Sequence, residues 1–255
     1  MERAYDRELS ESARSSVIGF PNGIATVTFT QGCNLRCPWC YHKGVDGEVL
    51  PCRSTDFDGE ACLRSLAQRK DRLRGVSLSG CEPLLQPRLP EFIAKIKDLG
   101  LLVKIDTNGT LPHRLKHLLD RKLLDYVALE IKAPIDDAGA YSFAGGGLID
   151  ISRLRDSVDL LCQAAPCGEF RTTLAPSFHK IGLLRRIVRS LPNDLPHCFE
   201  ILNPKNAKSG YWKQLYPVSD DLLREMINQL RWEFPGHSLL IRSKSGSAYR
   251  SADAR

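Results

Sequence analysis

Hydrophobic and polar positions follow two patterns that alternate along most of the chain. Short apolar runs rich in β-branched residues, which are typical of buried strands, occur at 24–30, 75–79, 101–106, 126–132, 169–175, 197–202 and 238–241. Between several of these runs, apolar residues recur every three or four positions, as they do on the buried face of a helix. The pattern predicts alternating strands and helices from residue 23 onward.

Four stretches carry such a helical stripe, and we interpret each stripe as a face packed on the core. The stripes are Leu89, Phe92, Ile93 and Ile96; Leu111, Leu115, Leu118 and Leu119; Ile181, Leu184, Val188 and Leu191; and Leu222, Leu223, Met226, Ile227, Leu230 and Phe234. Ser219 or Asp220 stands where a capping residue would begin the last helix.

Strict alternation of strands and helices predicts a parallel sheet covered by helices, and six or seven such units favour a barrel or an incomplete barrel over a flat sheet. The expected fold is therefore an α/β partial barrel of parallel strands with outer helices, over residues 23–242. Residues 1–22 are expected to form an N-terminal extension, and residues 243–255 a disordered C-terminal tail. In barrels of this kind, functional groups collect at the C-terminal ends of the strands.

The composition is that of a single enzyme of ordinary size. Of the 255 residues, 36 are Lys or Arg and 30 are Asp or Glu, and the net charge of +6 is not gathered into one basic tract. A nucleic-acid partner is therefore not indicated. No apolar run is long enough to span a membrane, and the polar start lacks the apolar segment of a signal peptide. We expect a cytoplasmic protein that has no membrane partner.

Nine cysteines are present, but they do not indicate a disulfide framework, because the count is odd and the chain is too large to need one. Cys62, Cys162 and Cys198 lie in apolar surroundings and are expected in the core. Cys52 and Cys167 fall near predicted loops or strand ends and receive no role.

Three cysteines form a motif directly after the first predicted strand. Cys33, Cys37 and Cys40 have the spacing Cys-x3-Cys-x2-Cys. Three thiolates this close, without a fourth at matching spacing, can hold three corners of a [4Fe–4S] cluster and leave one iron open. An open iron can bind a substrate or a cofactor.

Two other interpretations of the motif remain open. A structural zinc site normally has four ligands, and no second Cys-x2-Cys pair exists downstream, although His42 is a further candidate ligand. A redox pair of the thioredoxin type would use Cys37 and Cys40 and leave Cys33 without a function. Spacing alone favours the iron–sulfur cluster over both.

Polar residues at the ends of the other predicted strands are expected at the same edge of the sheet. They are Ser79-Gly80-Cys81-Glu82-Pro83 after the second strand, Asp106-Thr107-Asn108-Gly109 after the third, Glu130 and Lys132 in the fourth, Arg171 in the fifth, and Asn203-Pro204-Lys205 after the sixth. Each group has an ordinary structural alternative, namely a turn at Gly80, a helix cap at Asp106 or Asn108, or a solvated ion pair of Glu130 with Lys132. Their shared position beside the cysteines favours one site.

The segment from Cys33 to Cys40 resembles the signature of the radical S-adenosylmethionine (SAM) superfamily, Cys-x3-Cys-x-aromatic-Cys, with Trp39 in the aromatic place. The resemblance implies a partial (β/α)6 TIM-type barrel and a [4Fe–4S] cluster ligated by the three cysteines. It also implies that the amino and carboxylate groups of SAM bind the open iron. An electron from the cluster then splits SAM into methionine and a 5′-deoxyadenosyl radical.

The run from Ser79 to Pro83 is similar to the Gly-Gly-Glu motif of this superfamily, which binds the SAM amino group. Gly80 and Glu82 match the motif, whereas Cys81 replaces the second glycine. Glycine lets the backbone approach a ligand closely, so the replacement is a departure from the pattern. The small thiol is either tolerated there or serves as an extra ligand, and we favour tolerance.

Further stretches resemble the glycyl-radical-enzyme activating enzymes, and most of all the activating proteins of anaerobic ribonucleoside-triphosphate reductase. They are residues 25–33, 104–109, 131–134 and 169–173. In these enzymes an Asp-Thr pair and an Asp-x-Lys pair contact SAM and a monovalent cation. Asp106, Thr107 and Lys132 match, with Asn108 beside them, whereas Glu130 replaces the aspartate and leaves the cation site open to question.

Other positions match the activating enzymes less completely. Arg171 falls where an arginine lies near the SAM carboxylate or the partner's glycine loop, and a guanidinium group suits a carboxylate. Lys205 is a weaker candidate. Tyr41 and His42 align with a Cys-His-Asn sequence without matching it.

The implied reaction removes a hydrogen atom from a glycine α-carbon of a glycyl-radical enzyme, of the anaerobic ribonucleotide reductase type. A flavodoxin or a ferredoxin-type protein would donate the electron. Hydrogen-atom removal needs no general base, which agrees with the lack of a convincing Ser/His/Asp arrangement. The partner loop is expected near Gly109, Arg171 and Lys205, and residues 144–147 form either a rim for its entry or a plain turn.

Two alternatives are kept. A radical SAM enzyme that acts on a small molecule, resembling 7-carboxy-7-deazaguanine synthase, would share the cluster and the SAM residues but enclose its substrate in a smaller polar pocket. A non-catalytic iron–sulfur or zinc-binding protein would need the cysteines but no SAM.

Overall fold

The structure is a computed structural model that describes residues 15–16, 25–30, 32–40, 59–164, 167–204, 207, 210–242 and 248–249. Within these ranges the strands form one sheet of nine in the order β1 to β9, so each strand lies beside its neighbours in the sequence. The expected extension and tail fall almost wholly outside the described ranges. Two short strands belong to them, β1 (Ser15–Ser16) and β9 (Ala248–Tyr249).

Seven parallel strands make up the body of the sheet, and each corresponds to an expected strand with its ends shifted by no more than two residues. They are β2 (Ala25–Thr30), β3 (Gly75–Gly80), β4 (Leu102–Thr107), β5 (Tyr126–Glu130), β6 (Cys167–Leu174), β7 (His197–Ile201) and β8 (Leu239–Arg242). The strands β1 and β9 add antiparallel edges. The sheet is curved and, in the described ranges, β1 does not pair with β9, so the expected partial barrel is confirmed.

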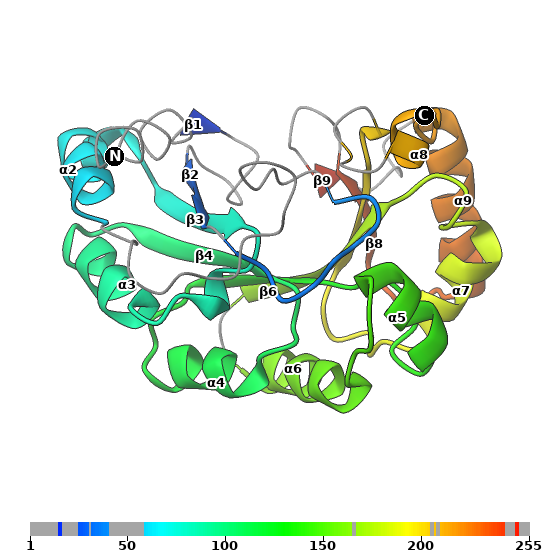
Figure 1. Cartoon of the computed structure of the whole chain (residues 1–255), viewed down its shortest axis with the longest axis horizontal. Coiled ribbons are helices and arrows are strands. Elements are labelled where there is room, and N and C mark those ends of the chain that lie inside the picture. The colour runs from blue at the N-terminus through cyan, green and yellow to red at the C-terminus, as the bar shows by residue number, and fades with distance from the viewer. Residues whose placement is uncertain are drawn as a thin grey trace.

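Helices line the outer, convex side of the curved sheet (Figure 1). They are α2 (Glu60–Arg69), α3 (Leu89–Asp98), α4 (Pro112–Asp120), α5 (Ala138–Gly145), α6 (Ile151–Gln163), α7 (Ile181–Arg189), α8 (Gly210–Lys213) and α9 (Asp220–Glu233), with short 3-10 turns at Lys70–Arg72 and Pro83–Leu85. No helix in the described ranges is long and apolar enough to cross a membrane.

The four helical stripes are confirmed in α3, α4, α7 and α9, with one correction: Leu222, in the first turn of α9, is 46% exposed and does not belong to the buried face. Ser219 caps α9, because its side chain accepts a hydrogen bond from the Leu222 amide at 3.1 Å. Helices α2, α5 and α6 contain none of the residues of those four stripes. Helix α6 is nonetheless amphipathic, with Leu154, Val158 and Leu161 buried, and it begins at a capping residue, Asp150.

The expectation that three cysteines belong to the core is confirmed. Cys62 and Cys198 are buried, and Cys162 packs against the core. Cys167 begins β6 and is exposed, while Cys52 lies outside the described ranges. All eight cysteines in the described part of the chain are free thiols.

The cysteine segment, residues 32–40, runs from the end of β2 across the carboxyl end of β4 toward α5 (Figure 1). One end is attached to β3, because the Glu82 amide donates to the Gly32 carbonyl at 2.9 Å. Farther along, the Arg36 amide donates to the Gly145 carbonyl at 2.7 Å. The segment is therefore held by both the sheet and the end of α5.

Gly146 makes the contact between α5 and the cysteine segment possible. It follows α5 with a left-handed φ of +73°, and a Cβ at this position would collide with the Arg36 carbonyl. Only glycine combines that φ with so close an approach at low cost. Residues 144–147 are thus the plain end of a helix, the second of the two interpretations above.

Replacing this glycine tests the contact. Gly146→Ala is expected to lower the free energy of unfolding by about 1–3 kcal/mol for the left-handed φ alone, and by more for the collision. The measurement is chemical denaturation. Gly147→Ala is the matched control, since a Cβ there meets no atom within 4 Å. Equal stabilities of the two variants would contradict the described contact.

Candidate functional site

The three motif cysteines lie together in the segment after β2, each partly buried. The Cys33 sulfur accepts hydrogen bonds from the Leu35 amide at 3.3 Å and from the Asn108 side-chain amide at 3.8 Å. Burial raises the pKa of Cys33 to about 12, although the Leu35 amide acts in the opposite direction, and burial also raises the pKa of Cys37. Both thiols are protonated at neutral pH, so a bound metal must displace their protons.

Side chains from two elements fix the shape of this segment. Asn34 donates to the Thr110 hydroxyl at 2.7 Å and accepts from Asn108 at 3.0 Å, which joins the segment to the end of β4. The guanidinium group of Arg36 donates to the carbonyls of Cys33 and Leu35 at 2.8 and 2.9 Å. Sequence analysis identified Asn108 but missed Asn34 and Thr110.

The donor set fits an iron–sulfur cluster. Thiolates are the usual ligands of such clusters, and N–H donors to the sulfurs tune them. Lys132 lies close enough to Cys33 and Cys37 to lower the pKa of both thiols against the effect of burial. In the described ranges no three His, Cys, Asp or Glu side chains are arranged around a single metal ion. A cubane does not need such an arrangement, since each cysteine binds a different iron.

Glu82 connects the ends of β3 and β4 and is completely buried. Its carboxylate accepts hydrogen bonds from the Thr107 hydroxyl at 2.7 Å, the Asn108 amide at 2.8 Å and the Leu84 amide at 3.1 Å. Burial raises the pKa of Glu82 to about 7 despite these donors. The glutamate of the Gly-Gly-Glu-like motif thus holds the neighbouring strand end, and its contact with SAM stays a prediction.

The backbone on either side of Cys81 explains how the motif tolerates a side chain there. Gly80 has a φ of +111° and therefore needs to be glycine. In the described ranges the non-glycine residues with positive φ are Lys122 and Ser177, so Cys81 has an ordinary conformation. The thiol that replaces the second glycine causes no backbone strain.

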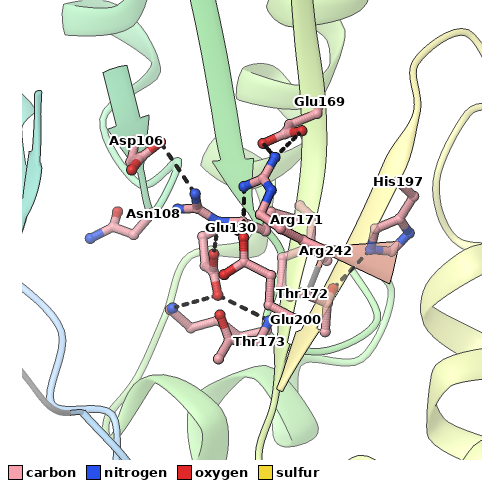
Figure 2. Close-up of polar contacts among 12 residues, drawn as sticks. Asp106, Asn108, Glu130, Glu169, Arg171, Thr172, Thr173, His197, Glu200 and Arg242 are labelled. Atoms are coloured by element: carbon pink, nitrogen blue, oxygen red, sulfur yellow. Dashed lines mark hydrogen bonds and ion pairs between the residues drawn. The ribbon is translucent and has the colours of Figure 1, made fainter. Parts of the chain in front are cut away.

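Asp106, Glu130 and Arg171 form an ion-pair group at the neighbouring strand ends (Figure 2). The Arg171 guanidinium lies 3.3 Å from Asp106 and 2.9 Å from Glu130. Burial alone would raise the pKa of both carboxyl groups, but Arg171 helps to hold both below their usual values, with Lys104 at Asp106 and Lys132 at Glu130. The Ser79 hydroxyl also bonds to Asp106.

This geometry rules out two of the ordinary structural roles considered above, namely the solvated ion pair of Glu130 with Lys132 and the helix cap at Asp106 or Asn108. Lys132 lies 4.0 Å from Glu130, and their side chains are only 13% and 15% exposed, so they are not a solvated surface pair. Helix α4 begins after Leu111 without a side-chain cap, so neither Asp106 nor Asn108 caps it. Lys205, Tyr41 and His42 lie outside the described ranges.

A second group of charges continues the first across β6, β7 and β8 (Figure 2). Arg242 binds both oxygens of Glu169, at 2.7 and 2.8 Å, and lies 2.7 Å from Glu200. Lys104 lies 3.3 Å from Asp106 and 3.8 Å from Glu169, which joins the two groups. Sequence analysis gave no role to Lys104, Glu169, Glu200 or Arg242. Each of these charged residues alternates with apolar residues within a predicted strand or directly after it, and that alternation was the signal that could have identified them.

Trp39 is buried in a cluster of aromatic rings. It is 5% exposed and packs against Phe178, Trp212 and His179, with ring centroids 5.2, 5.2 and 5.6 Å away. The turn that carries it is closed by a hydrogen bond from the Cys40 amide to the Cys37 carbonyl at 3.0 Å.

A model of the radical SAM superfamily matches residues 27–172, more than half of the chain. The chain belongs to the radical SAM superfamily. Enzymes of this superfamily use a [4Fe–4S] cluster and SAM, so the zinc and redox-pair interpretations of the motif are set aside in favour of the cluster.

Two relatives match this radical SAM enzyme over most of their length. A Methanocaldococcus jannaschii protein named as a glycyl-radical enzyme activating enzyme is 28% identical over 221 residues, which cover 83% of this chain and 86% of the relative. The 7-carboxy-7-deazaguanine synthase of Methanopyrus kandleri is 27% identical over 242 residues, which cover 86% of this chain and 94% of the relative.

A solved structure supports the fold. SuiB of Streptococcus suis, in its crystal structure with bound S-adenosylmethionine, matches 94% of this chain with a TM-score of 0.63 and 14% identity. The radical SAM enzyme described here spans about half of that structure, 54% of its length.

The hydrogen bond from Thr107 to Glu82 can be tested by mutation. Thr107→Val removes the hydroxyl donor with little change of shape. Loss of a hydrogen bond to a buried, charged acceptor is expected to lower the free energy of unfolding by about 1.5–3 kcal/mol. Because the raised pKa keeps Glu82 protonated near pH 5, the loss of stability is expected to be larger at pH 8, where the group is ionised.

Ser77→Ala is the matched control, since the Ser77 hydroxyl is buried and has no hydrogen-bond partner in the part of the chain that the structure describes. Its removal is expected to cost less than about 1 kcal/mol at either pH. Denaturation midpoints at the two pH values give the comparison. A Thr107→Val defect that does not change with pH would contradict the ionised role of Glu82.

Proposed function

We propose that this radical SAM enzyme generates a glycyl radical on a partner enzyme of the anaerobic ribonucleotide reductase type. The end-to-end similarity to the M. jannaschii relative, which is named for glycyl-radical enzyme activation, carries the proposal. The segments around Asp106, Lys132 and Arg171 support it, because they resemble activating enzymes and are brought together beside the cysteines.

The charge pairing on the inner face of the sheet also favours a protein substrate. Four basic side chains (Lys104, Lys132, Arg171 and Arg242) and four acidic ones (Asp106, Glu130, Glu169 and Glu200) neutralise one another. Recognition of a small charged substrate, in addition to SAM, would require more of these groups to leave their partners, at a cost in desolvated charge. A glycine in an extended loop carries no charge, so it can be bound without charged side chains of the enzyme.

Cys33, Cys37 and Cys40 are the proposed cluster ligands, with the fourth iron left for SAM. When bound, the cluster supplies the electron that splits SAM into methionine and the 5′-deoxyadenosyl radical. Lys132 is positioned near the thiols, where its positive charge can balance an anionic ligand. Trp39 would contribute the packing that shapes the end of the motif.

The strand-end residues are proposed to bind SAM. Ser79 and Gly80 would present backbone at the end of β3, while Glu82 keeps Thr107 and Asn108 in place. Asp106 and Glu130 would hold a monovalent cation or the SAM amino group. Since Arg171 already spans these two carboxylates, we assign it the task of positioning them rather than of binding the SAM carboxylate alone.

In the proposed reaction, a hydrogen atom moves from the glycine α-carbon to the 5′ carbon of the adenosyl group. No proton is transferred, so the protein's tasks are to orient the two carbons and to exclude water. An acidic flavodoxin or a ferredoxin-type protein would supply the electron.

The cluster assignment is tested by Cys37→Ala. The variant is expected to lose the visible absorbance of the reconstituted cluster and to form no 5′-deoxyadenosine above background, because two thiolates cannot hold the cubane. Cys167→Ala, which removes an exposed thiol, is the control and should match the wild type. Retention of SAM cleavage by Cys37→Ala would rule out the assignment.

The substrate is tested by electron paramagnetic resonance under strict anaerobiosis. Reconstituted enzyme, SAM and a reductant are incubated with anaerobic ribonucleotide reductase, and a glycyl radical is expected on the reductase. If 7-carboxy-7-deazaguanine accumulates from its precursor while the reductase stays radical-free, the enzyme acts on a small molecule, as the M. kandleri relative is named to do.

A further inference from the structure

An array of aromatic side chains begins at the cysteine motif. Trp39 stands between two of the proposed cluster ligands, Cys37 and Cys40, and its ring lies 5.2 Å from both Phe178 and Trp212. Phe178 precedes α7, and Trp212 belongs to α8. Rings from two later parts of the chain therefore meet at the motif.

The array reaches the molecular surface in two places. Phe143 of α5 lies 5.1 Å from Phe178 and is 53% exposed; Tyr211 of α8 lies 5.5 Å from Trp212 and is 60% exposed. A continuous series of rings thus leads from the motif to two exposed aromatic side chains. Clustered exposed aromatic residues are typical of protein–protein contact sites.

The segments that carry these rings are basic. Residues 32–40, 138–149, 175–182 and 210–218 contain no Asp or Glu, whereas they contain Arg36, Lys180 and Lys213, which are all exposed. Close contacts join the segments, through the Arg36 amide to the Gly145 carbonyl and through Trp39 to the other two. A surface with this charge favours an acidic partner.

The array and the SAM-binding edge contact different parts of the cysteine segment. The Cys33 end is bonded to the end of β4 through Asn34 and Asn108, next to the proposed SAM residues. The Trp39 end packs on Phe178 and on α8, so the rings approach the motif from the other flank. A protein bound over the rings would leave the SAM edge for the substrate.

We propose that the exposed face of this array, formed by Phe143 and Tyr211 with the partly buried Phe178 beside them, is the docking surface for an acidic one-electron carrier protein, and that the electron passes by Trp39 to the cluster. The carrier loses one electron and the cluster gains one, without any bond being made or broken. Small interfaces of this kind are typical of electron-transfer complexes. The inference rests on the proposed cluster ligands and not on the identity of the substrate.

The experiment compares a protein donor with a small reductant. Reduced flavodoxin or dithionite is mixed anaerobically with the reconstituted enzyme, and cluster reduction is followed by visible absorbance. Reversing the charge in the Lys180→Glu/Lys213→Glu variant is expected to slow reduction by flavodoxin at least about tenfold at low salt. Reduction by dithionite, which needs no docking surface, should be unchanged.

A second variant and a binding measurement separate docking from folding. The Phe143→Ser/Tyr211→Ser variant, which lacks the two exposed rings, should also show slower cluster reduction by flavodoxin, while its reduction by dithionite stays unchanged. Calorimetric titration with oxidised flavodoxin should show at least about tenfold weaker binding by the charge-reversed variant at low salt, and the difference should shrink as salt is added. Lys116→Glu on α4 and Trp232→Ala on α9, both at exposed positions elsewhere, are the matched controls.

The proposal would be overturned if the charge-reversed variant and the variant without the two exposed rings both bound flavodoxin, and were reduced by it, as well as the wild type. So would unchanged electron entry combined with lost binding of the glycyl-radical enzyme, because the face would then dock the substrate. A failure of the proposed function has a different signature, since flavodoxin would still reduce the cluster through this face while no glycyl radical formed.

Discussion

The arrangement of the site depends on the hydrogen bonds that the buried carboxylate of Glu82 accepts. Isolated in the interior, an ionised carboxyl group would be costly, and its three hydrogen-bond donors compensate only in part, which leaves the pKa at about 7. Two of those donors belong to the end of β4. Because Asn108 in turn reaches the Cys33 sulfur and Asn34, one side chain just after β3 sets the position of the cysteine segment.

The paired charges of β4 to β8 act on shape more than on stability. Burying ion pairs returns little net free energy, because the desolvation of each charge offsets its attraction to the partner. Removing one member, however, would leave an excess of buried charge; loss of Glu169, for example, would take an acidic partner from both Arg242 and Lys104. The network therefore holds each strand end in one arrangement, which suits the proposed reaction, because that reaction needs two carbon atoms kept in a reactive geometry.

Sequence analysis predicted the elements that depend on local pattern. All seven parallel strands and four helices followed from apolar periodicity, and the cysteine motif followed from spacing. Helix α5 was missed because its run of Ala, Gly and Ser has little amphipathic contrast. Arg242 and Glu200 were missed for another reason, since their roles come from pairing with residues far away in sequence, such as Glu169. Charge in a strand becomes informative only when the neighbouring strands are known.

The packing of Trp39 on Trp212 has a consequence for biogenesis. Each strand pairs with its sequence neighbours, so the sheet can grow in the order in which the ribosome releases it. The cysteine segment emerges early, yet one wall of its surroundings arrives only when α8 has been synthesised. Until then an indole that is finally buried remains open to water and to chaperones. The cysteine segment is accordingly enclosed only after the chain has been synthesised as far as α8.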